Sequence, residues 1–173
     1  MYTHLYHPHP DHGFDDHGAP LDAMLEARSR GVLFDVGHGV GAFAWRVAEP
    51  ACRTFGFWPD TISTDLHQFN LRGPVFDLPT TMSKFLYLGM PLEQIIRATS
   101  FAPAAAMRLP DRIGTLRTGL QADITVLRKV SGSFPLMDVE GQVRLAPERL
   151  VAVSVCKLGR WTTCAASEPG ASS

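Results

Sequence analysis

Three polar side chains that could bind a metal ion follow apolar segments at separate points of the chain. His4 and His38 each lie at or just after an apolar and aromatic run, and Asp65 ends the run Thr61-Ile-Ser-Thr-Asp65. Imidazole nitrogen and carboxylate oxygen suit zinc or a similar divalent ion. One such residue is more often hydrogen-bonded or a cap, but three in succession at equivalent positions indicate a site. Parallel strands would bring all three to one edge of a sheet, where α/β proteins place their chemistry.

A glycine-rich loop, Gly37-His-Gly-Val-Gly41, stands between a predicted strand and a predicted helix. Its glycine spacing differs from that of the dinucleotide fingerprint, so a nucleotide site is not expected. We expect glycine here to let the backbone approach a substrate closely, with His38 and Gly39 as substrate contacts. Of the five histidines among the first 17 residues, only His7 and His9 lie near enough to the end of the first predicted strand to contribute.

Alternating strands and helices would position these residues, and the hydrophobic pattern predicts such an alternation. Short apolar runs predict strands, helical periodicity with glycine stops predicts helices, and the connections are long enough for parallel crossovers. Lys84 and Arg97 fall on two of the helices, away from strand ends, and are predicted to be surface charges. The predicted strands cover 1–6, 32–36 and 61–65, and the predicted helices cover 21–30, 42–55, 78–88 and a segment that begins at Pro91.

The pattern changes after Pro103. Runs at 113–116, 122–127 and 150–156 are β-type and are separated by glycine-rich turns, which predicts a separate antiparallel β element. We therefore divide the chain into an α/β unit, a small β unit and a small polar tail that we expect to be disordered, with bounds at 1–106, 107–166 and 167–173.

The composition excludes several classes of protein. The 173 residues suffice for one domain with a core or for two small ones, and a net charge of −1 gives no sign of a nucleic-acid partner. The three cysteines are odd in number and lack ligand spacing, so free thiols are expected. No apolar run reaches membrane-spanning length, and no signal-peptide pattern opens the chain. We expect a cytoplasmic protein with neither a membrane nor a nucleic acid as partner.

Several segments together resemble the amidohydrolase superfamily, and most closely its amidohydrolase/deacetylase branch, which is similar to dihydroorotases. The run from Arg30 to Asp65 is the specific part, whereas the later Gly-Leu-Gln-Ala-Asp turn is shared across the superfamily. The resemblance implies the C-terminal half of a TIM (β/α)₈ barrel in residues 1–106, followed by a small β-sandwich portion in residues 107–166. It extends to about residue 161 and rests on Thr3-His4, 30–39, 59–65, 73–78, 82–86 and 114–124.

The resemblance also implies roles for individual residues. His4 matches the metal-binding histidine of the sixth barrel strand, and His38 matches the seventh-strand position, where a substrate contact is expected. Asp65 matches the eighth-strand aspartate, which ligates the metal, accepts a proton from water and passes it to the leaving group. One or two zinc ions, or similar divalent ions, are implied as the cofactor.

The implied function is hydrolysis of a small-molecule acyl amide or ester, as in a deacetylase, by metal-activated water. The superfamily's first-strand His-x-His pair, fourth-strand carboxylated lysine and fifth-strand histidine have no counterpart in this sequence. We therefore expect a truncated chain that is inactive and poorly folded alone and that associates with a missing barrel half or with itself, because a half-barrel exposes strand edges. Two alternatives stay open: a dihydroorotase-like cyclic amidase, and a non-catalytic barrel remnant that associates with a missing half.

Overall fold

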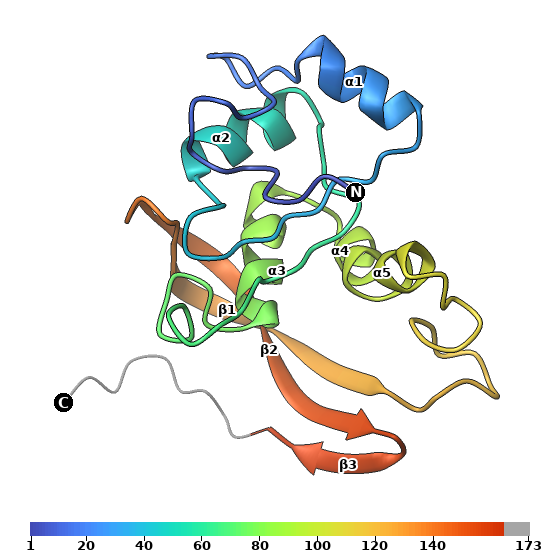
Figure 1. Ribbon diagram of the computed structural model, residues 1–173. Coiled ribbons are helices and arrows are strands. Elements are labelled where there is room, and N and C mark those ends of the chain that lie inside the picture. The colour runs from blue at the N-terminus through green and yellow to red at the C-terminus, as the bar shows by residue number, and fades with distance from the viewer. Residues whose placement is uncertain (165–173) are drawn as a thin grey trace.

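In the computed structural model, which describes residues 1–164, extended segments alternate with helices, and a β-sheet follows at the end of the described part (Figure 1). The predicted tail, 167–173, lies outside the described residues. Within the described part, no helix is long and apolar enough to cross a membrane. The helices are α1 (Asp22–Ser29), α2 (Trp45–Glu49), the π-helix η1 (Pro50–Thr54), α3 (Leu78–Leu88), α4 (Leu92–Thr99) and α5 (Phe101–Ala106). The antiparallel sheet has the order β1 (Ile124–Met137), β2 (Val143–Lys157), β3 (Arg160–Thr163).

Three extended segments, which contain the three predicted strands, run side by side in parallel. Tyr2 bridges Phe34 and Asp35 bridges Thr61, both in parallel register. Helix α1 connects the first segment to the second, and α2 with η1 connects the second to the third, which confirms the predicted alternation. The segments form isolated bridges rather than continuous strands, because residues with positive φ, such as His4 at 62°, interrupt the pleat.

Helix α3 lies at the centre of the fold (Figure 1), and its bounds agree with the prediction. Asp77 accepts a hydrogen bond from Thr80 N at 2.7 Å at its start, and Gly89, with a φ of 99°, ends it. One side of α3 contacts β2, where Leu150 N donates to Ser83 Oγ at 2.8 Å. The opposite side packs against aromatic rings of the first two extended segments. Because both sides are covered, α3 is a core helix rather than an amphipathic surface helix.

The tip of the β1–β2 hairpin docks onto the chain just before α2. The buried carboxylate of Asp138 accepts hydrogen bonds from Trp45 N at 2.9 Å and from Gln142 N at 2.7 Å. Val139 N donates to Phe43 O at 3.1 Å. These contacts tie the sheet to the stretch that follows the glycine-rich loop.

The strands β1 and β2 are longer than the predicted runs 122–127 and 150–156, β3 is not predicted, and three further details differ from the sequence prediction. The helix predicted for 42–55 is divided into α2 and η1, since Pro50 lacks the amide that a continuous α-helix needs. Helix α5 is not predicted, yet Pro103 lies in its first turn, where a proline is tolerated. The β-type run 113–116 contains no strand, because Gly114 turns at a φ of 88° and packs closely on α5.

Candidate active site

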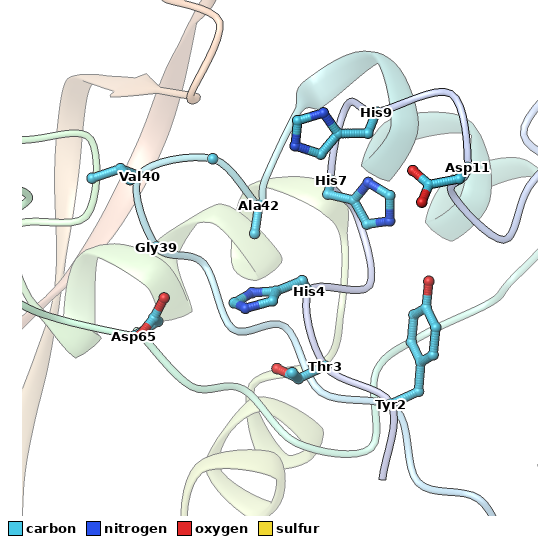
Figure 2. A pocket seen from close by; sticks show the side chains of 11 residues that line it. Tyr2, Thr3, His4, His7, His9, Asp11, Gly39, Val40, Ala42 and Asp65 are labelled. Atoms are coloured by element: carbon cyan, nitrogen blue, oxygen red, sulfur yellow. The ribbon is translucent and has the colours of Figure 1, made fainter.

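A pocket of about 470 Å³ lies between the ends of the extended segments (Figure 2). It brings together three of the predicted site residues, His4, Gly39 and Asp65, whereas the His38 side chain does not line it. Its size suits a small-molecule substrate. The lining residues are Tyr2, Thr3, His4, His7, His9, Asp11, Gly39, Val40, Gly41, Ala42 and Asp65.

His4 is oriented by the glycine-rich loop. Its Nδ1 lies 2.6 Å from Gly37 O, so Nδ1–H donates to this carbonyl and Nε2 keeps its lone pair. A Cβ on Gly37 would lie 2.8 Å from His4 Nδ1, so the close approach requires glycine. Figure 2 shows the ring directed toward the side of the pocket where Asp65 lies. The free nitrogen is therefore available to a metal ion.

Asp65 presents its carboxylate from the loop that follows the third extended segment. The buried Asn70 donates from Nδ2 to Asp65 O at 2.8 Å and fixes the turn. A Cβ on Gly39 would lie 2.7 Å from Asp65 Oδ2, so this glycine too makes room for a candidate ligand. Among the described residues, none donates a hydrogen bond to the Asp65 carboxylate. Its oxygens are free to bind a metal ion or to accept a proton.

The backbone is strained at both candidate ligands. The φ angle is 62° at His4 and 46° at Asp65, in the left-handed region that residues other than glycine rarely adopt. Such conformations cost on the order of 1–3 kcal/mol each and cluster at functional sites. Five described residues other than glycine have a positive φ, and the two that line the pocket are His4 and Asp65, which supports a functional role for them.

Asp35 joins the three extended segments near the pocket and is a residue that the sequence prediction missed. Its carboxylate accepts hydrogen bonds from Thr3 Oγ1 at 2.8 Å in the first segment. It also accepts them from Thr61 Oγ1 at 2.7 Å and Ser63 Oγ at 2.6 Å in the third. The sequence does contain a sign of this role, because a carboxylate inside the apolar run 32–36 needs hydrogen-bond partners to offset the cost of burying its charge.

His38 lies behind the pocket and contacts Lys84. The His38 ring is fully buried, with Nε2 2.5 Å from Lys84 Nζ and Nδ1 3.0 Å from Gly39 O. Lys84 is fully buried as well, so the prediction of a surface charge is wrong for this residue. The physical reason is the covering of α3 on both sides, together with carbonyl acceptors for the ammonium group. Arg97 is exposed, as predicted.

Burial sets the protonation of this pair. Burial, together with the nearby charge of Lys84, lowers the pKa of His38 to about 3. Burial also lowers the pKa of Lys84 to about 7, against the opposing effect of the Asp138 carboxylate. At neutral pH the His38 imidazole is therefore neutral, donating from Nδ1 to Gly39 O and accepting at Nε2 from Lys84. A direct contact between His38 and a substrate stays a prediction.

The wall of the pocket beside His4 is polar (Figure 2). The rings of His7 and His9 lie 5.4 Å apart between centroids. His7 Nδ1 is buried and has no hydrogen-bond partner among the described residues, and burial lowers the pKa of its ring against the effect of Asp11. Burial, reinforced by the Asp11 carboxylate, raises the pKa of Tyr2. This wall offers hydrogen-bonding groups to a substrate beside the candidate ligands.

The candidate site provides two metal donors. Within residues 1–164, no group of three or more His, Cys, Asp and Glu side chains is placed to hold a metal ion. The His4 imidazole and the Asp65 carboxylate are donor types that suit zinc, but catalytic zinc sites generally use three protein ligands. The two residues therefore fit as part of a metal site that needs at least one further ligand.

The sequence profile of the Amidohydrolase family matches residues 39–150, and the chain belongs to this family. It is 42% identical over 113 residues to a deacetylase of Agrobacterium fabrum, an alignment that covers 65% of this chain and 27% of that protein. It is 38% identical over 130 residues to a deacetylase of Enterococcus faecalis, covering 75% of this chain and 35% of that protein. The chain is thus a homologue of amidohydrolase-family deacetylases that spans about a third or less of their length.

Two solved structures are similar over nearly the whole chain. A crystal structure of an adenine deaminase matches with a TM-score of 0.88 and 33% identity, over 94% of this chain and 44% of that one. A crystal structure of a dihydroorotase matches with a TM-score of 0.81 and 31% identity, over 93% of this chain and 43% of that one. The mixed α/β fold with its antiparallel sheet is therefore a partial amidohydrolase structure.

Proposed function

We propose that the chain supplies His4 and Asp65 to the zinc site of an amidohydrolase that removes an acyl group from an amide or an ester, as a deacetylase does. The observation that carries the proposal is the convergence of these two residues on one pocket, with a free imidazole nitrogen and a free carboxylate. The homology to deacetylases supports the reaction class.

Residues 1–106 would then form the C-terminal half of a TIM barrel. Parallel bridges between successive extended segments, with helices in the connections, support this architecture. The coverage of 44% of the adenine deaminase chain and 43% of the dihydroorotase chain also agrees with half of such a fold. The remaining ligands would come from a polypeptide that completes the barrel, or from a second copy of this chain.

The residues of this chain would divide the chemistry between them. When bound, zinc makes hydroxide available near neutral pH and polarises an acyl carbonyl. Asp65 takes the proton of the attacking water and returns it to the leaving nitrogen or oxygen, because its carboxylate is exposed to the pocket and accepts no other hydrogen bond from the described residues. His4 is held in one tautomer by Gly37 O, and the missing side chain of Gly39 leaves room for a substrate beside Asp65.

A dihydroorotase-like cyclic amidase is the second candidate. The match to the dihydroorotase structure favours it, and the same His4 and Asp65 would serve a ring amide as well as an open-chain one. The two candidates differ in whether the acyl group is released as a separate molecule or stays attached after ring opening.

The test uses an assembled protein, which we define as this chain co-expressed with the part of the Enterococcus faecalis deacetylase that the alignment leaves uncovered. Acetate release from N-acetylated amino acids and acetyl esters, and ring opening of cyclic amides, are measured with zinc present. We expect acetate release, and Asp65→Asn should lower kcat by about 10²–10⁴-fold because the general base is lost. The matched control is Asp111→Asn, at an exposed carboxylate that does not line the pocket, which should keep wild-type activity. Equal activity of the Asp65→Asn and wild-type proteins would reject the proposal, and ring opening alone would select the cyclic amidase.

A further inference from the structure

The side-chain nitrogen of Lys84 is enclosed in the protein and has three hydrogen-bond acceptors around it. Its Nζ lies 2.5 Å from His38 Nε2, 2.6 Å from Met137 O and 3.2 Å from Pro74 O. In its ammonium form Lys84 has three donors, and all of them are used. Burying a lysine is costly unless it is fully hydrogen-bonded, and an apolar side chain would serve packing alone at lower cost. The arrangement therefore points to a purpose beyond filling the core.

The three acceptors come from three different parts of the chain. His38 belongs to the glycine-rich loop, Pro74 belongs to the loop between Asp65 and α3, and Met137 ends β1. Lys84 itself lies on α3, the central helix. One nitrogen atom thus connects the two loops that flank the candidate site to the sheet and to the core.

The contact with His38 continues to the pocket. The His38 ring stacks on Phe43 with centroids 5.0 Å apart and an interplanar angle of 12°, so its plane is fixed. Its Nδ1 then donates to Gly39 O at 3.0 Å. Gly39 N in turn donates to Thr64 O at 3.0 Å, and Thr64 is the neighbour of Asp65 in the chain. Asp65 Oδ2 lies so close to Gly39 that a Cβ at this position would leave it no room. Any shift of the imidazole would therefore move Gly39 against the carboxylate.

We propose that Lys84 is a positioning residue, which acts through the His38 imidazole to hold loop 37–41 in the conformation that places Gly39 beside Asp65. The role of the positioned carboxylate rests on the proposed function, whereas the positioning itself is a property of this chain. The neutral state of His38 at neutral pH supports the proposal, since only an unprotonated Nε2 can accept from Lys84.

The test compares two variants of the same helix by nuclear magnetic resonance of the 173-residue chain. Lys84→Met keeps most of the side-chain length but removes every donor. Ser83→Ala removes the hydrogen bond from Leu150 N that joins α3 to β2 and the one that Ser83 Oγ donates to Pro79 O within α3. We expect Lys84→Met to shift the imidazole nitrogen signals of His38 and the amide signals of Gly39 and Asp65. Ser83→Ala should shift signals around Leu150 and Pro79 and leave those of Gly39 and Asp65 unchanged.

A second pair of variants keeps the test decisive if Lys84→Met fails to fold. His38→Gln places an amide oxygen near the position of Nε2 and retains an acceptor for Lys84, whereas His38→Ala removes it. We expect the loop and Asp65 signals to shift in His38→Ala and to return toward wild-type positions in His38→Gln. Unshifted Gly39 and Asp65 signals in Lys84→Met, or in His38→Ala when the first variant is unfolded, would overturn the proposal.

An activity measurement separates this inference from the proposed function. In the assembled protein, Lys84→Met should lower kcat by about 100-fold, as misplacement of a reacting group does, with a smaller change in KM. A wild-type protein without hydrolase activity would reject the proposed function and leave the resonance result valid. An active Lys84→Met protein with wild-type kcat would reject the positioning role at the site.

Discussion

Replacing Asp35 tests whether the three extended segments are held together by one carboxylate. In Asp35→Ala, three hydroxyl groups lose their acceptor. Thr61 is buried and cannot turn to water, so its unpaired hydroxyl should cost about 1–3 kcal/mol. The hydroxyl groups of Thr3 and Ser63 are more accessible, so water can take the place of the lost acceptor. The loss of each of these two hydrogen bonds should therefore cost about 0.5–1 kcal/mol. The free energy of unfolding should fall by about 3 kcal/mol in total.

Urea denaturation followed by tryptophan fluorescence measures this change, and the slope of the free energy against urea should stay constant. Thermal unfolding should show a midpoint lower by about 6–12 °C, given the size of the chain. Asp35→Asn keeps one acceptor oxygen and should lose only about 1 kcal/mol. Asp111→Asn, at a side chain that is 88% exposed, is the control and should stay within about 0.5 kcal/mol of wild type. A loss below 0.5 kcal/mol in Asp35→Ala would refute the reasoning.

Two further predictions concern the glycine-rich loop and the buried pair behind it. Gly39→Ala should lower the zinc affinity of the assembled protein at least about 10-fold, because its Cβ would lie 2.7 Å from Asp65 Oδ2. Gly56 has a φ of 63°, close to the 50° of Gly39, but a Cβ there would meet nothing within 4 Å. Isothermal titration with zinc should therefore show no change for Gly56→Ala, and equal losses in both variants would contradict the steric explanation. Lys84 has its ordinary pKa of 10.5 in the unfolded chain and a pKa of about 7 in the folded chain, so between these two pH values the unfolded chain binds more protons. The free energy of unfolding should therefore rise with pH between about 7 and 10.5, by at most about 1.4 kcal/mol per pH unit. The same sign holds for His38 between a folded pKa of about 3 and its ordinary 6.5, where stability should fall as the solution is acidified. Urea denaturation at several pH values should show that Lys84→Met removes the alkaline rise, and an unchanged rise would contradict the assignment.

The sequence predicted those parts of the fold that local chemistry determines. Helix α3 was predictable from Leu78 to Leu88 because Asp77 caps its start and Gly89 ends it. The alternation of extended segments and helices followed from hydrophobic pattern and glycine stops. The positions of His4 and Asp65 at one pocket also agree with the expectation that parallel segments bring their ends together.

The features that the sequence did not predict depend on tertiary contacts. Lys84 is buried because the sheet covers the outer side of α3, and local periodicity contains no information about that contact. The signal available was a single charge in a helix that is otherwise uncharged. The role of Asp35 was hidden for the same reason, since its hydroxyl partners lie 26 to 32 residues away in sequence. The interruption of the strands likewise follows from positive φ angles at His4 and Asp65, and although Asp and His are enriched in that region, residue type alone does not predict it at a given position.

The zinc content of the assembled protein tests the central claim most directly. Elemental mass spectrometry of wild type, His4→Ala and Asp65→Ala, after dialysis against metal-free buffer, gives the number of zinc ions per molecule. If His4 and Asp65 are ligands of the same site, wild type should retain zinc and each variant should lose it, since the loss of a direct ligand weakens the site. Zinc retained in full by both variants, with circular dichroism showing intact folds, would contradict the account.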